Sequence, residues 1–389
     1  MVAYDSDRNF ITLDMLQKGT GVLSVTDRDA YIALNMMDRV GPVRVRAMVE
    51  SFGSVQAIFS ASAKELQQVD GVGPALASAI ISQRDRINPA AEEDKAHKRG
   101  VTIVTPLDAA YPAALLTIHD PPLALYVRGN LRAGDAQSIA VVGTRHPTHY
   151  GVECARKLSF GMAKSGLCVI SGLALGIDTA AHEGALRAKG RTIAVIGGGF
   201  DHLYPSENVR LAEEIADQGA VISEFPFSRK PDRTTFPMRN RIVSGMSRGV
   251  LVVEASMESG AMITANQASD QGRSIFAVPG RIDSYASRGP NVLIRDGAQV
   301  VTELRDVLEH FEMLFPEPSE VTDQRGYSRG DLTENERKVV TLLGGGDMSV
   351  DRLIRESGVA PATMASLLIG LELKKIIKML PGRCVALLH

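Results

Sequence analysis

Six short runs rich in valine and isoleucine constrain the fold of this chain more than any other feature of its sequence. In order they read SIAVVG, LCVIS, TIAVIGG, AVISE, GVLVVEA and SIFAVPG, between residues 138 and 280. Each run is followed by a glycine-containing loop and then a helical pattern, which is the rhythm of a doubly wound parallel sheet. Runs that are apolar throughout suit strands covered on both faces. We therefore expect an α/β, extended Rossmann-like domain over residues 100–309, in which the prolines of residues 100–137 mark a wrapping extension with further strand.

Residues 27–95 lack this pattern and are expected to be all-helical, after an N-terminal extension at residues 1–26. They contain two similar pieces, RVGPVRVRAMVE at 39–50 and GVGPALASAIIS at 71–82, each a turn followed by an apolar-periodic helix. The second is close to the helix–hairpin–helix signature, whose backbone N–H groups can contact nucleic-acid phosphates. A SAM/helix–hairpin–helix-like module that serves packing alone is the alternative.

The C-terminal part begins with a polar segment, residues 310–330, whose two prolines are typical of a linker. Residues 331–389 then show short helical patterns and an extended end. This is the helix–turn–helix–strand order of a winged helix, with ESGVAPATM supplying the turn and the start of the second helix. A small helical oligomerisation domain is the alternative.

Composition argues against several classes of protein. The 389 residues carry a formal net charge of −2, so a site for a polyanion has to be a local concentration of basic residues. No apolar run approaches the roughly 18 residues of a membrane span, and the N-terminus lacks a signal pattern. The three cysteines match neither a disulfide framework nor a metal-site spacing. We therefore expect a cytoplasmic protein without a metal, a cofactor or a membrane span.

The loops after the strands hold the candidate site, because ligands of open α/β sheets bind beyond the carboxyl ends of the strands. The first loop, residues 143–151, lacks the G-x-G-x-x-G pattern, and no acidic residue ends the next strand, which disfavours a nicotinamide dinucleotide. This loop places Arg145 where a guanidinium can bind phosphate through two parallel hydrogen bonds. Asp178 is positioned to cap the helix after the second strand. Ser259 and Gly260 open a later helix and offer an anion a hydroxyl and N–H groups.

Basic residues concentrate in residues 229–248, where six lysines and arginines accompany one aspartate, a local net charge of +5. Phe225, Phe227 and Phe236 lie in or beside this stretch. Cations that follow phosphates, together with rings that stack on bases, are what single-stranded nucleic acid requires. The pattern therefore indicates such a site, and a solvated basic loop with its phenylalanines in the core is the alternative.

The segment FPMRNRIVSGMS, residues 236–247, places two arginines at the start of an expected helix, where positive charge opposes the helix dipole. At about 100° per residue, Arg239 lies near the centre of the apolar face and Arg241 points almost opposite. We expect Arg239 to reach an internal carboxylate or carbonyl. Arg241 is expected to project into the crevice beside Phe236 and Arg145.

The middle of the chain resembles the DNA-processing protein A family (DprA, also called Smf) along its whole length. The resemblance is carried, in order, by VVGTRHPTHYG, ISGLALGIDTAAHEGAL, TIAVIGGGFDHLYPSEN, ISEFPF, FPMRNRIVSGMS, VVEASMESGAMITANQA, and FAVPG with GPNVLIRDGA. It implies a homodimer that binds and protects single-stranded DNA taken up in natural transformation and helps to load the RecA recombinase. It implies no established catalytic activity.

The patterns and the resemblance together give a set of candidate DNA-binding residues. They are Gly143, Thr144, Arg145, Arg233, Phe236, Arg239, Asn240, Arg241, Ser259, Gly260 and Arg273. The chain departs from the family pattern in SGAM, where SGSL is more usual, which leaves Ser259 as the hydroxyl of its loop. It also departs in LELKKIIK, where a glycine usually follows the first lysine.

Two other functions compete with this interpretation. Nucleotide phosphoribohydrolases of related fold carry P-G-G-x-G-T-x-x-E, whereas this chain has only VPGRIDS at 278–284. A nucleophile elbow, a P-loop and a close pair of carboxylates are also missing, so we expect no enzyme. A winged-helix regulator of duplex DNA would use KKIIK at 374–378 and Arg383. Residues 331–389 hold eight basic and seven acidic side chains, a balance that does not favour strong duplex binding.

Overall fold

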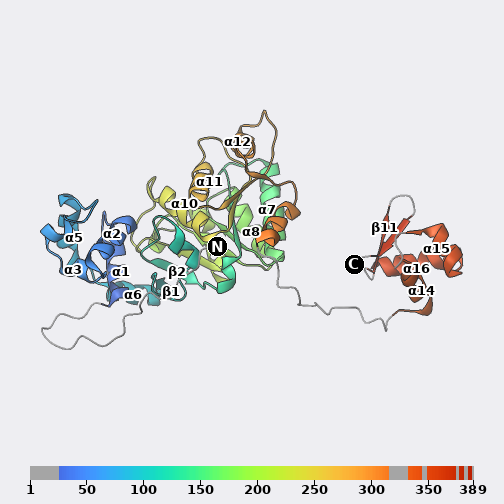
Figure 1. The fold of residues 1–389 in the computed structure, drawn as a ribbon, viewed down its shortest axis with the longest axis horizontal. Helices are drawn as coiled ribbons and strands as arrows, with labels where there is room; N and C mark the ends of the chain where they lie inside the picture. Colours follow the sequence, from blue (N-terminus) through green and yellow to red (C-terminus); the bar gives the residue numbers. More distant parts are fainter. Residues whose placement is uncertain (1–25, 315–331, 344–347, 374–375, 381–383, 388–389) are drawn as a thin grey trace, which may run out of the picture. The chain divides into compact units, whose positions relative to one another are not determined.

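The computed structural model describes residues 26–314, 332–343, 348–373, 376–380 and 384–387 (Figure 1). Two compact units divide the chain between residues 315 and 316. The expected N-terminal extension and most of the expected linker lie outside the described residues. The linker boundary at residue 310 is wrong, because helix α13 (Leu304–Leu314) continues past it. Within the described ranges, no helix combines the length and the apolar character needed to cross a membrane.

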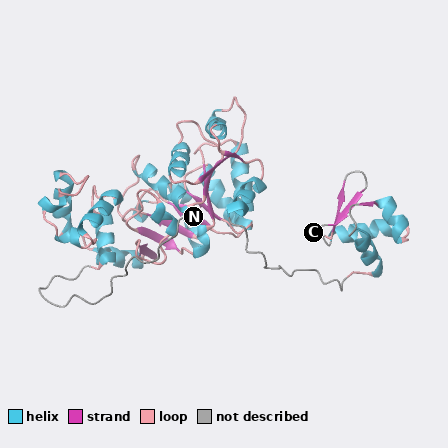
Figure 2. Ribbon diagram, in the orientation of Figure 1, coloured by secondary structure: helices cyan, strands magenta, loops and turns pink. Residues whose placement is uncertain are grey.

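A nine-stranded sheet forms the centre of the first unit, in the order β1-β2-β6-β5-β4-β3-β7-β8-β9. Figure 2 shows strands in magenta among the helices of this unit. Its six central parallel strands are the six runs found in the sequence: β3 (Ser138–Val142), β4 (Cys168–Ser171), β5 (Thr192–Val195), β6 (Ala220–Ser223), β7 (Gly249–Val252) and β8 (Ser274–Ala277). The extended, doubly wound Rossmann-like prediction is therefore confirmed. Antiparallel strands β1 (Val101–Val104) and β2 (Leu125–Gly129) extend the β6 edge. The two-residue strand β9 (Gln299–Val300), too short to predict, extends the other edge.

Helices cover both faces of this sheet. One face packs against α7 (His149–Lys164), α8 (Ile177–Arg187) and α13. The other packs against α10 (Thr235–Met246), α11 (Gly260–Asp270), α12 (Arg288–Arg295) and the short helix η1 (Ala113–Thr117). A further helix, α9 (Val209–Gln218), lies against β5 and β6.

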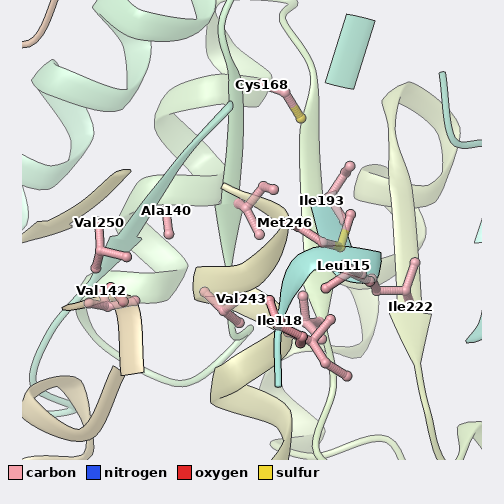
Figure 3. Packing of buried hydrophobic residues seen from close by; sticks show 14 of the residues in the cluster. Leu115, Ile118, Ala140, Val142, Cys168, Ile193, Ile222, Val243, Met246 and Val250 are labelled. Carbon is pink, nitrogen blue, oxygen red and sulfur yellow. The ribbon is translucent and has the colours of Figure 1, made fainter. Parts of the chain in front are cut away.

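The alternation of side chains along β3 explains why residues 139–142 of this strand are all apolar. Ile139 and Val141 belong to the core beneath α7 and α8. Ala140 and Val142 belong to the opposite core, where they lie with Val243 of α10 (Figure 3). Because both faces are buried, a polar side chain in this strand needs a partner within the protein, as Ser138 at its start finds by donating to the carbonyl of Met246 over 3.0 Å.

Six helices build the N-terminal module: α1 (Asp27–Met36), α2 (Pro42–Phe52), α3 (Ala57–Ser60), α4 (Ala63–Leu66), α5 (Pro74–Arg84) and α6 (Pro89–Lys98). The two similar sequence pieces form α2 and α5. Each begins with a proline directly after a glycine, Gly41 or Gly73, because proline lacks only an N–H that the first helical turn leaves unpaired. The module contacts the sheet domain, where Asn35 Nδ2 donates to the carbonyl of Glu224 over 2.9 Å.

The second unit has its own apolar core and the predicted winged-helix order. Its elements are α14 (Glu334–Leu343), β10 (Met348–Ser349), α15 (Val350–Ser357), α16 (Pro361–Leu373), β11 (Ile377–Leu380) and β12 (Cys384–Leu387). Gly358 ends α15 in the left-handed conformation, with φ of 68°, so the turn falls where the sequence places it. Of the candidate duplex-binding residues, Lys378 lies in β11, and Lys374, Lys375 and Arg383 lie outside the described residues.

Candidate functional site

The direction in which strands are added to the sheet reverses between β3 and β7. Strand β3 pairs with β4 on one side and with β7 on the other, so the loops at their carboxyl ends diverge. A hydrogen bond of 2.7 Å from Thr144 N to the carbonyl of Glu254 joins these loops at their base. Above this bond lies a cleft of about 290 Å³, which we call the switch-point cleft. It is lined by Val142, Gly143, Thr144, Arg145, His146, Gly172, Ala174, Asp178, Phe236, Arg239, Asn240, Val243, Ser256, Ser259, Gly260, Ala261 and Thr264.

Arg145 and Phe236 form the exposed side of the switch-point cleft. The guanidinium carbon of Arg145 lies 5.2 Å from the centre of the Phe236 ring, within the range of a cation–π interaction. Tyr204 stands beside the same ring, with 6.1 Å between the ring centres. Gly176 packs against the loop that carries Arg145. Its positive φ of 85° and its close approach to the carbonyl of Thr144 leave no room for a side chain, which explains the glycine at this position. A cation and an aromatic face are thus presented together.

Arg239 forms the floor of the cleft. Its Nη1 donates to the carbonyls of Gly172 and Val195, at the ends of β4 and β5, and its Nε donates to Asn240 Oδ1 over 3.1 Å. This confirms the prediction that Arg239 reaches internal carbonyls. Burial lowers the pKa of Arg239 to about 10, so it remains charged at neutral pH. A methyl group on Gly172 would overlap the guanidinium, so glycine is required there.

Asp178 is the carboxylate nearest to this buried cation. The cap prediction for Asp178 is wrong, because Gly176 occupies the N-cap position of α8. Asp178 lies within the first turn and accepts bonds from the backbone N–H groups of Gly172 at 3.1 Å and Ala174 at 3.3 Å. Burial raises the pKa of the Asp178 carboxyl, while Arg239 and these N–H groups oppose the rise. The carboxylate therefore fixes the loop after β4 and offsets part of the charge of Arg239.

The start of α11 forms the opposite wall. Ser259 is its N-cap, and the Ser259 hydroxyl accepts from Ala261 N over 3.3 Å. Asn240 Nδ2 donates to the carbonyl of Gly260 over 3.3 Å, which joins α10 to this wall. A helix N-terminus carries partial positive charge, so the wall favours an anion together with the two arginines. Among the described residues, His, Cys, Asp and Glu form no group of three that could hold a metal ion.

Arg241 does not reach the switch-point cleft, and the prediction that it projects beside Phe236 and Arg145 is wrong. Its side chain is buried between Asp120, whose Oδ2 lies 3.0 Å from Nε, and Glu224, which pairs with Nη2. The angular separation of the two arginines along α10 was correct. The side of α10 assigned to the cleft was wrong. Arg241 faces the buried end of β6, where Glu224 follows the strand. The acidic residue in ISEF was the signal that sequence reasoning missed.

Two more candidate arginines also lie elsewhere. Arg233 is exposed and does not line the cleft. Arg273 Nη2 donates to the carbonyls of Ala114 at 3.1 Å and Gly245 at 2.9 Å, and so ties η1 to the end of α10. Phe225 and Phe227 are buried in the core, as the alternative interpretation of the phenylalanines expected. The structure brings together the other eight candidates: Gly143, Thr144, Arg145, Phe236, Arg239, Asn240, Ser259 and Gly260.

Comparison with known proteins gives consistent matches along the chain. The model of the DNA recombination-mediator protein A family matches residues 102–312. A SAM-like helix-hairpin-helix tandem matches residues 31–85, and the DprA winged helix domain matches residues 328–383.

Individual relatives extend these matches. Protein Smf of Synechocystis sp. is 39% identical over 282 residues, which cover 72% of this chain and 71% of that protein. The DNA processing protein DprA of Bacillus subtilis is 44% identical over 214 residues, 54% of this chain and 72% of that protein. The structure of DprA from Streptococcus pneumoniae matches with a TM-score of 0.64 and 34% identity, covering 74% of this chain and 98% of that one. A structure of DNA processing protein A from Helicobacter pylori, described as giving insights into the single-stranded DNA binding mode of that relative, matches with a TM-score of 0.50 and 31% identity, over 55% of this chain and 96% of that one.

Proposed function

Because the chain belongs to the DNA recombination-mediator protein A family, we propose that it binds single-stranded DNA in the switch-point cleft, protects that DNA and helps to load the RecA recombinase onto it. The Helicobacter pylori relative, whose description names single-stranded DNA binding, supports the ligand. Recombinase loading and a homodimeric state follow from the family resemblance. We expect this role to be carried out in the cytoplasm.

One observation carries the proposal: the Arg145 guanidinium lies over the Phe236 ring at the mouth of a cleft whose floor is the cation Arg239. Single strands expose both phosphates and unpaired bases, so they can use the cations and the aromatic face together. Stacking of a base on an aromatic side chain contributes about 1–3 kcal/mol. Duplex DNA keeps its bases stacked inside and gains only the phosphate contacts. The arrangement therefore favours single strands without selecting a sequence.

The proposed role is binding without catalysis. Two carboxylates of the loops around the cleft are already engaged by the protein. Asp178 accepts two backbone N–H bonds, and Glu254 accepts from Thr148 N at 2.8 Å and Thr148 Oγ1 at 2.6 Å. Both carboxylates therefore hold loops beside the cleft in place. Release of free base from nucleoside monophosphates would favour the competing hydrolase instead.

Fluorescence anisotropy tests the proposal directly. The full chain is titrated onto single-stranded and duplex DNA of equal length at two salt concentrations. We expect tighter binding of the single strand, with log K falling by about 0.7 per phosphate contact for each tenfold rise in salt. The absence of a single-stranded complex at low salt would refute the proposal. Preferential binding of duplex DNA would favour the winged-helix alternative.

A further inference from the structure

A larger cleft of about 1000 Å³ lies between the helical module and the sheet domain. One wall is the turn between α1 and α2, residues 37–42, and the other is the segment 224–230 that follows β6. We call it the module cleft. None of the candidate DNA-binding residues except Arg241 lines it.

The module cleft carries an excess of positive charge. Five cations line it, together with the two carboxylates of Asp38 and Glu224. With Asp232 and Asp120, which pair with Arg229 and Arg241, the balance is five minus four, or +1. The five cations are Arg39, Arg44, Arg229, Lys230 and Arg241. Half-exposed apolar side chains, including Met36 and Met238, lie among them. A ligand that suits this lining is anionic and has apolar surface of its own.

Arg39 is held in a conformation that is uncommon for any residue except glycine. Its φ is 66°, in the left-handed region. Gln83 of α5 fixes the turn by accepting from Asp38 N over 2.9 Å and donating to the carbonyl of Asp38 over 3.3 Å. Strained backbone that the surrounding structure enforces occurs preferentially at binding sites. Within the described part of the chain, the exposed side chains of Arg39 and Lys230 make no hydrogen bond or ion pair, so both are available to a ligand.

Arg241 supplies an independent indication of an anion. Its side chain is only 6% exposed, and its Nε and Nη2 pair with Asp120 and Glu224. The remaining nitrogen, Nη1, is buried and has no acceptor among the described residues. Buried donors in native proteins are almost always paired. An anion at the inner end of the module cleft would provide the missing acceptor.

We propose that the module cleft binds the phosphate backbone of the same single strand that occupies the switch-point cleft, an inference that rests on the proposed function. The two clefts lie on either side of the segment leading into α10. Lys230 lines the module cleft and Phe236 lines the switch-point cleft, only six residues later. Their Cα atoms are therefore at most about 20 Å apart. The exposed Arg233 lies on the segment between them, so a strand crossing from one cleft to the other meets a further cation.

This continuity favours nucleic acid over an acidic peptide as the occupant. A single strand presents phosphates at regular intervals, and its bases can cover the methionines of the module cleft. The proposal therefore predicts that binding depends on length. A short oligonucleotide fills the switch-point cleft alone, and a longer one gains the module cleft as well.

The test compares labelled oligothymidylates of about 5 and about 20 nucleotides by fluorescence anisotropy on the full chain. The variant is the double substitution Arg39→Gly and Lys230→Ala. It removes two exposed cations, and glycine accepts the positive φ at residue 39. The matched control is Lys164→Ala. Lys164 is exposed at the end of α7, just before β4 begins, and therefore lies near the amino ends of the parallel strands, whereas the clefts lie at their carboxyl ends.

For the double variant, we expect the affinity for the long oligonucleotide to fall by about 25-fold near 0.1 M salt. The magnitude of its salt slope should fall by about 1.4, as for two lost phosphate contacts. Affinity for the short oligonucleotide should change by less than about twofold, which also shows that the variant is folded. The control should match the wild type at both lengths.

Three results overturn the inference. One is an equal loss of affinity at both lengths, and another is an unchanged affinity for the long oligonucleotide. The third is displacement of the long oligonucleotide by poly-glutamate from the wild type but not from the double variant, which would assign the cleft to an acidic peptide. Failure of the wild type to bind either oligonucleotide would refute the proposed function itself and, with it, the inference about the module cleft.

Discussion

Replacing Arg241 with alanine should lower the stability of the first unit by a large amount. Arg241 and Glu224 are 6% and 7% exposed, and Arg241 is the only cation paired with Glu224 within the described residues. Removing one member of a buried ion pair leaves the other charge without compensation, which costs about 3–5 kcal/mol. For a unit of this size each kcal/mol shifts Tm by about 2–4 °C. The expected decrease in Tm is therefore about 6–20 °C.

The decrease should depend on pH in a defined direction. Burial raises the pKa of the Glu224 carboxyl, and Arg241 opposes that rise. Without Arg241 the pKa rises further, so the penalty applies at neutral pH, where folding must bury an ionised carboxylate. Below the unfolded-state pKa of about 4.3, the carboxyl is protonated in both states and the penalty disappears. The difference in Tm between wild type and variant should therefore narrow between neutral pH and about pH 4.

Differential scanning calorimetry measures these shifts. The control is Glu224→Gln added to Arg241→Ala, which removes the uncompensated charge and should recover part of the lost Tm at neutral pH. A variant with the Tm of the wild type would refute this reasoning, because it would show that Glu224 does not depend on Arg241 for compensation of its charge.

Four further predictions concern the cleft and its surroundings. Arg145→Ala should reduce single-stranded DNA affinity about fivefold near 0.1 M salt, as for one lost phosphate contact, and leave Tm unchanged because Arg145 is exposed; an unchanged affinity removes it from the site. Phe236→Ala should cost about 1–3 kcal/mol of binding free energy in the same titration and Phe236→Tyr much less, so equal losses would argue against stacking. Gly172→Ala should lower the free energy of unfolding by about 1–3 kcal/mol in urea denaturation, because the new methyl group overlaps the guanidinium of Arg239. Burial lowers the pKa of His182 to about 3, so only the unfolded state gains its proton below about pH 6.5; stability should fall by about 1.4 kcal/mol per pH unit towards pH 4 from this group, and His182→Asn should remove that part of the slope.

The sequence predicted the sheet well because its strands are buried on both faces. Most residues of each strand are apolar, and this pattern can be recognised in the sequence without knowing which strands are neighbours. The candidate site was predicted only in part. Helical periodicity correctly separated Arg239 from Arg241, but the partner of a buried arginine depends on tertiary packing. Glu224 lies 17 residues before Arg241 in the chain. No local pattern connects the two residues.

The same dependence on tertiary packing explains why the sequence did not predict the module cleft. Arg39 and Lys230 are almost 200 residues apart, and they approach one cleft only because the helical module packs against the end of β6. Composition showed the excess charge at 229–248 but not the second wall that faces it. The two-residue strand β9 was missed for a simpler reason: a strand of that length has no periodicity to detect.

The two arginines of the switch-point cleft differ in how freely they can evolve. Arg145 stands on an exposed loop and contacts a ring, so exchanging it alters the surface and leaves the scaffold intact. Arg239 holds the carbonyls at the ends of β4 and β5 and is at the same time the floor of the cleft. A change that tunes ligand affinity at Arg239 therefore also alters the fold. A library selected for folding alone should accept many residues at position 145 and almost none at position 239, so new ligand preferences on this scaffold can arise at the rim of the cleft but not at its floor.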